Sequence, residues 1–166
     1  MRHRFPQRIR QDPARTRRIP RGRQRRPLAA RFLNPRRSPV PAYAHRKTVP
    51  YPFAQALERT RAALAAQGFG VPVEMDTQAI FMAKLGKASP RRVILGACLP
   101  QVAFQALEAE PEIAVLLPCN VVVTEQPGGA LVTTIAAQEL FRLTRQVDPA
   151  HAGVVDQKLL AALAAI

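Results

Sequence analysis

The sequence lacks any run of about 18 apolar residues, the shortest stretch that crosses a bilayer as a helix. Its longest apolar run, IAVLLPCNVVV at 113–123, is interrupted by Pro118 and Asn120. The basic N-terminus also lacks the apolar segment of a signal peptide. The sequence therefore predicts a chain without a membrane span, and we expect it to be cytoplasmic.

Cysteine is scarce, with only Cys98 and Cys119 in 166 residues. Two cysteines do not make a disulfide framework, and thiols stay reduced in the cytoplasm. The sequence also contains no P-loop, no GxGxxG motif and no serine nucleophile elbow. Nothing here identifies a reaction, so the sequence favours a protein that is not an enzyme.

Acidic residues are almost absent from the first 47 positions, which hold 16 Lys and Arg against Asp12 alone. Residues 48–166 hold nine basic and ten acidic side chains. The formal charge of +14 therefore divides into +15 for the tail and −1 for the body. Only the tail can attract nucleic acids or other polyanions, and we expect that binding to be weak and non-specific.

The tail at 1–47 is also rich in proline, which recurs at positions 6, 13, 20 and 27. Proline stops helices, and so few large apolar residues cannot offset the entropy of ordering. We expect the tail to be disordered. A translation start assigned too far upstream is a second interpretation of this Arg/Pro-rich composition.

Residues 48–166 are long enough for one domain with a real core. Apolar periodicity and the positions of Pro and Gly indicate alternating strands and helices followed by a hairpin and terminal helices, an α+β fold. The expected strands are 46–51, 69–75, 93–98, 120–126 and 130–136, and the expected helices are 52–67, 76–85, 100–109, 136–143 and 149–166.

Several helix positions receive specific roles. Asp76 is expected to cap its helix and Gly86 to follow its end. The side chains expected to point inward are Ile80, Phe81, Leu85, Val102, Ala103, Ala106, Leu107, Val154, Val155, Leu159 and Leu163. Glu108, Glu110 and Glu112 are expected to form a solvated helix end.

A resemblance to a known family lies in the segments FAQALERTRAALAAQGFGV, ILGACLP and QALEAEPEIAVLLPCNVVV and in the PGG hairpin. In these segments the sequence resembles the bacterial domain-of-unknown-function family 302. The resemblance covers about residues 48–166 and none of the tail. It implies a single-sheet α+β domain similar to the TATA-binding-protein-like fold, often dimeric, with no established activity. Leu99 stands where many relatives have Asn, and Cys98 and Cys119 mark a subgroup, so cysteine chemistry is not the family's general function.

Cys98 and Cys119 carry two interpretations. Free cysteine is among the most buried residue types, which favours two core thiols. Alternatively, the strand that ends at Cys98 and the one that begins near Cys119 are neighbours, and the thiols form a redox pair or ligand pair. Cys98 precedes a helix N-terminus, which favours its thiolate. We expect Cys98 to be the more reactive.

A metal site needs further ligands, since structural zinc usually takes four. The body offers only His151, with His45 at its edge, and no CxxC or HxxxH spacing. We therefore predict no cofactor. Zinc held by Cys98, Cys119 and His151, or by thiols of two chains, is the alternative.

Arg91 and Arg92 are candidate contacts for an anionic ligand, although the sequence favours two solvated residues at the start of a strand. The sequence thus favours an uncharacterised binding or accessory protein that forms a homodimer. The alternatives are a thiol-dependent redox or metal-handling protein and a nucleic-acid binder that acts through its tail.

Overall fold

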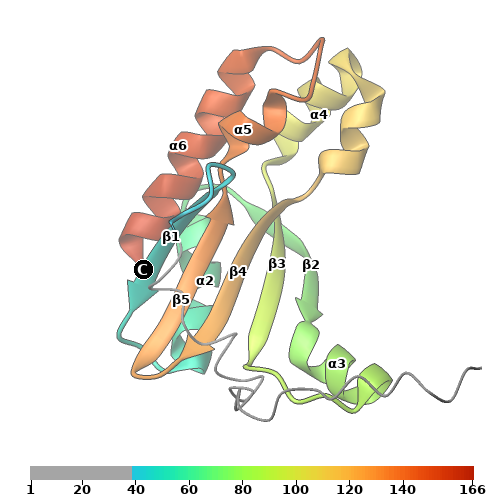
Figure 1. Cartoon of the computed structure of the whole chain (residues 1–166). Helices are drawn as coiled ribbons and strands as arrows, with labels where there is room; N and C mark the ends of the chain where they lie inside the picture. Colours follow the sequence, from blue (N-terminus) through green and yellow to red (C-terminus); the bar gives the residue numbers. More distant parts are fainter. Residues whose placement is uncertain (1–38) are drawn as a thin grey trace, which may run out of the picture.

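The computed structural model describes residues 39–166. One five-stranded sheet and several helices make up this part of the chain (Figure 1). In chain order the elements are β1 Ala44–Val49, α2 Phe53–Ala66, β2 Gly70–Asp76, α3 Thr77–Leu85, β3 Arg92–Cys98, α4 Pro100–Ala109, the 3₁₀ helix η2 Pro111–Leu116, β4 Cys119–Gln126, β5 Gly129–Ile135, α5 Ala137–Phe141 and α6 Pro149–Ala165.

The sheet has the strand order β1-β5-β4-β3-β2, and every neighbouring pair is antiparallel. The expected α+β fold with a single sheet is confirmed, as are the interior position of β3 and the β4–β5 hairpin. Because β1 and β2 lie at opposite edges, the helix between them, α2, must cross the sheet (Figure 1).

The main core lies between one face of the sheet and helices α2 and α6. Alternate residues of the inner strands point into it, as a half-covered antiparallel sheet requires. The buried side chains from the sheet are Val93, Leu95, Ala97, Cys119, Val121, Val123 and Val132, and those from the helices include Phe53, Leu57, Leu64, Val155 and Leu159.

A second, smaller apolar cluster joins α4 and η2 to α5 and the start of α6, with Ala106, Ile113, Phe141, Val147 and Ala152 buried together. Glu110 lies between α4 and η2 and was expected to be solvated. Its carboxylate is open to solvent and also accepts the backbone N–H groups of Gln146 (2.9 Å) and Arg145 (2.8 Å), and these bonds lower its pKa. Glu110 therefore ties α4 to the loop before α6.

The ordered body begins earlier than expected. Residues 44–47, which the charge pattern assigned to the tail, form most of β1 and pair with β5. Basic side chains are ordinary on an edge strand, where they discourage pairing with other chains, so charge was a poor guide to this boundary. The expected disorder of residues 1–38 lies outside the described part of the chain.

Expectations about burial were wrong on three helices, α3, α4 and α6. Asp76 caps α3, accepting the N–H of Ala79 at 3.0 Å, and Gly86 ends it with φ of 60°, both as expected. However, Ile80 and Leu85 of α3 are exposed and Phe81 is only half-buried. Leu107 of α4 and Val154 of α6, also expected to point inward, are 37% and 41% exposed. Helical spacing identifies an apolar face but not what covers it.

No helix among residues 39–166 is both long and apolar enough to cross a membrane.

Candidate functional site

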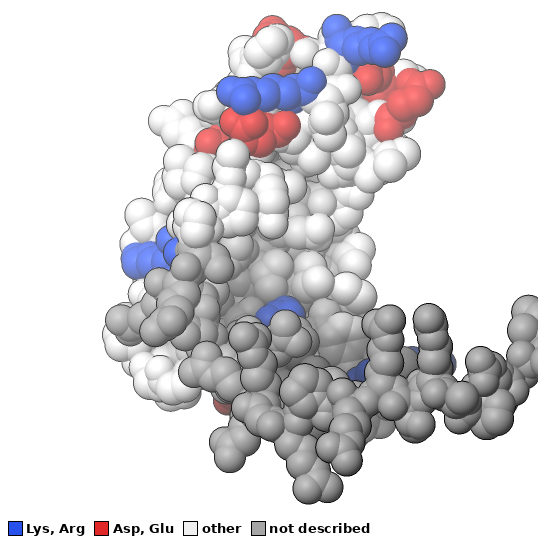
Figure 2. All heavy atoms as spheres, in the orientation of Figure 1, with Lys and Arg blue, Asp and Glu red and all other residues white. Residues whose placement is uncertain are grey.

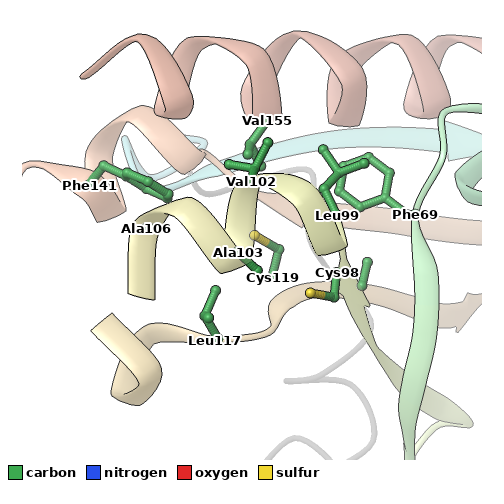
Figure 3. A pocket seen from close by; sticks show the side chains of 11 residues that line it. Phe69, Cys98, Leu99, Val102, Ala103, Ala106, Leu117, Cys119, Phe141 and Val155 are labelled. Atoms are coloured by element: carbon green, nitrogen blue, oxygen red, sulfur yellow. The ribbon is translucent and has the colours of Figure 1, made fainter. Parts of the chain in front are cut away.

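Cys98 ends β3 and Cys119 begins β4, and these strands are hydrogen-bonded neighbours, as the sequence indicated. The register sets Cys119 opposite Ala97, one residue before Cys98. Successive strand residues point to opposite faces. Both thiols are free, and in Figure 3 their sulfurs point in different directions.

The two cysteines line one apolar cavity at the end of the sheet, beneath α4 (Figure 3). The cavity is narrow and opens to the exterior, with an accessible volume of about 20 Å³, room for roughly one water molecule. Its other walls come from the strand ends, α4, α5 and α6, and consist of Phe69, Ala97, Leu99, Val102, Ala103, Ala106, Leu117, Phe141 and Val155. No charged side chain lines it, so its contents must be apolar.

Burial raises the pKa of both thiols. The pKa of Cys98 rises because burial disfavours the thiolate, and the pKa of Cys119 rises to about 11 through deeper burial, with smaller effects of Cys98 and the Asp156 carboxylate. The expected thiolate at Cys98 is therefore opposed by its surroundings. Both thiols are protonated near neutral pH, which favours their role as apolar wall.

A wider groove adjoins the cavity and shares Leu99 and Val102 with it. It runs between the end of α2, the start of α4 and the middle of α6, and it holds about 840 Å³ of unoccupied space, the solvent above it included. Lys158 lies on its wall and donates to the carbonyl oxygen of Gln67 at 3.0 Å. The exposed Val154, expected to be buried, also lines this groove.

The histidines do not join the cysteines in a metal site. Within residues 39–166 no three His, Cys, Asp or Glu side chains are grouped so as to hold a metal ion. His151 lies in the first turn of α6, where its Nδ1 is buried without a hydrogen-bond partner in the described structure. His45 instead contacts Asp156, with its Nε2 at 3.2 Å from Oδ1.

Asp156 is a structurally important residue that sequence reasoning missed. It is 6% exposed, and Oδ1 also accepts the N–H of Ala137 at the start of α5 at 2.8 Å. One carboxylate thus connects β1, α5 and α6. The available signal was a single acid on the apolar side of an Ala/Leu-rich helix, where an unpaired charge would be costly.

Arg91 and Arg92 do not form one anion site. Arg91 stacks over the Phe53 ring, 4.4 Å from its centroid, at the start of α2. Arg92 Nε donates to Thr124 Oγ1 at 3.1 Å across the β3–β4 pair. Arg91 precedes β3 and Arg92 begins it, and the two side chains have different partners, so adjacency in sequence did not imply a shared ligand.

Comparison with known proteins agrees with this architecture. The family model described as domain of unknown function DUF302 matches residues 45–166. The crystal structure of an uncharacterized conserved DUF302 protein from Bacillus stearothermophilus is 24% identical in sequence, with a TM-score of 0.67, over 75% of this chain and 98% of the other. A search of curated proteins found no match. The structural likeness supports the fold and indicates no activity.

Proposed function

This chain belongs to the DUF302 family, and we propose that it is a small binding or accessory protein that holds an amphipathic molecule in the cavity and groove beside Cys98. The cavity supports this proposal most directly. Ligand sites are concave and mostly apolar, with a few polar groups that fix orientation. Here the apolar cavity lies next to a groove that carries one lysine.

The wall chemistry favours an anionic head on an apolar body. The body would lie mainly in the groove, and its end would reach into the mouth of the cavity, against Leu99, Val102 and Ala103. Lys158 forms no ion pair with a described residue, and its ammonium has three donors, of which Gln67 takes one. A carboxylate or sulfonate at the groove would satisfy the others.

Octanoate and octanol test this proposal, because they share the apolar chain and differ in charge. We expect calorimetry to show tighter binding of octanoate to the full chain. Ala103→Phe should abolish binding of both by filling the cavity, whereas Gln105→Phe, at an exposed position of the same helix, should leave it unchanged. Equal binding by the two variants would contradict the proposal.

We also propose that the protein acts as a cytoplasmic homodimer. The apolar side chains that remain exposed on the described part of the chain support this. The thiol-based alternative is less well supported, because burial raises the pKa of both cysteines. Sedimentation of the full chain at tens of micromolar tests the dimer, and a monomer there would overturn it.

A further inference from the structure

The sheet has one face that points away from α2 and α6, here called the outer face. It is turned toward the reader in Figure 1, between α4 at its upper end and α3 at its lower end. The strand register defines three rows of side chains across it, Arg92-Thr124-Leu131-Thr48, Met75-Ile94-Val122-Thr133 and Val73-Gly96-Asn120. The middle of this face is therefore largely apolar.

Few charges interrupt the outer face. Among the paired strand positions, its charged residues are Arg46, opposite Thr133, and Arg92, opposite Thr124. No aspartate or glutamate occupies a paired position on it, since Glu74, Asp76 and Glu125 alternate to the other side. Where Figure 2 shows this side uncovered, the surface below the upper lobe is hollowed and mostly uncharged, with basic side chains at the left and near the middle.

Helix α3 borders the hollow and is itself uncovered. Ile80, Met82 and Leu85 are 42%, 51% and 60% exposed. Val73 and Met75, on the adjoining strand β2, are 53% and 40% exposed. Exposed large apolar side chains gathered on neighbouring elements of a small protein are typical of an interaction site.

We propose that the outer face is the homodimer interface and that α3 of each copy packs into the hollow of the other. This inference rests on the proposed dimer and adds its surface. Each copy of the chain has a concave apolar face and a protruding apolar helix. In a dimer with two-fold symmetry, the helix of each copy would cover the face of the other. Transient protein partners bind through surfaces that are more polar than the interfaces of permanent dimers.

The available area suits a second copy. Five strands about 4.8 Å apart and about six residues long give a footprint of roughly 24 by 20 Å, or about 500 Å². The uneven surface of the side chains and the added surface of α3 increase this area towards the roughly 800 Å² per partner of a standard interface. The sheet edges are less suitable, because Pro72 interrupts β2 and Arg46 and Lys47 lie on β1.

Sedimentation of the full chain with substitutions at exposed sites tests the surface. Met82→Glu changes α3 at a side chain that supports no core, so the fold should survive, as thermal unfolding will show. We expect it to weaken dimerisation by roughly 30-fold or more, the loss typical of a central interface residue. Leu160→Glu, on the exposed side of α6, is the matched control and should leave the dimer intact.

A photo-crosslinker placed at residue 82 provides an independent readout. In a mixture of light and heavy isotope-labelled chains, it should join residue 82 of one copy to β3 or β4 of the other. A dimeric wild type whose affinity is unchanged by Met82→Glu would overturn this surface and leave the proposed dimer standing. A monomeric wild type would overturn both, without affecting the octanoate test.

Discussion

At the scale of single residues, Asp156 connects three elements of the described structure, β1, α5 and α6. Its carboxylate accepts the Ala137 N–H and contacts His45, and it is almost fully buried. Asp156→Ala should lower the free energy of unfolding by about 1–3 kcal/mol, because the Ala137 N–H loses its partner. Urea unfolding measures this. The control is Glu139→Ala, which removes an exposed pair with Arg142 and should cost under about 1 kcal/mol.

The thiols provide a second prediction at this scale. Because their pKa values are raised, the reactive thiolate is rare at pH 7 and its fraction increases about tenfold per pH unit below the pKa. Iodoacetamide should therefore label both cysteines slowly at neutral pH and faster as pH rises, up to about 11 for Cys119. Cys98, the more exposed, should react first. Rapid labelling of Cys119 at pH 7 would contradict the burial argument.

At the scale of elements, local signals predicted the structure better than burial. Asp76 and Gly86 correctly marked the ends of α3 because capping and positive φ are properties of a few adjacent atoms. The inward orientation of Ile80 and Leu85 was wrong because burial depends on a covering surface elsewhere. The cavity could not be predicted either, since it requires α4 and α6 to meet over the strand ends.

Replacing glycine by alanine should have opposite effects on stability in β5 and in α6. Gly129 begins β5 with φ of 158°, and a Cβ there would lie 2.1 Å from the carbonyl oxygen of Val49. Gly129→Ala should therefore destabilise the β1–β5 pair, by about 1–3 kcal/mol for overpacking. Gly153, inside α6, has open space around its Cα, and Gly153→Ala should stabilise by about 0.5–1 kcal/mol. Thermal unfolding of both variants should show melting points displaced in opposite directions.

At the scale of the whole molecule, composition predicts two separable parts. Deleting residues 1–38 should leave the melting temperature of the body within a few degrees of the full chain, because the described sheet and cores are complete without them. The same deletion should abolish heparin binding, which in the full chain should fall steeply as salt increases. A large drop in melting temperature would show that the N-terminal residues stabilise the body.

The strand order also determines when the sheet can form during synthesis. β1 pairs with β5 alone, so Arg46 must wait for Thr133, 87 positions later in the chain. A ribosome releases the chain from its N-terminus, and pairings between distant residues slow folding. The first strand to emerge is therefore the last whose partner becomes available. Until β5 leaves the ribosome, α2 has only part of its sheet to pack against, and β1 has no strand to pair with.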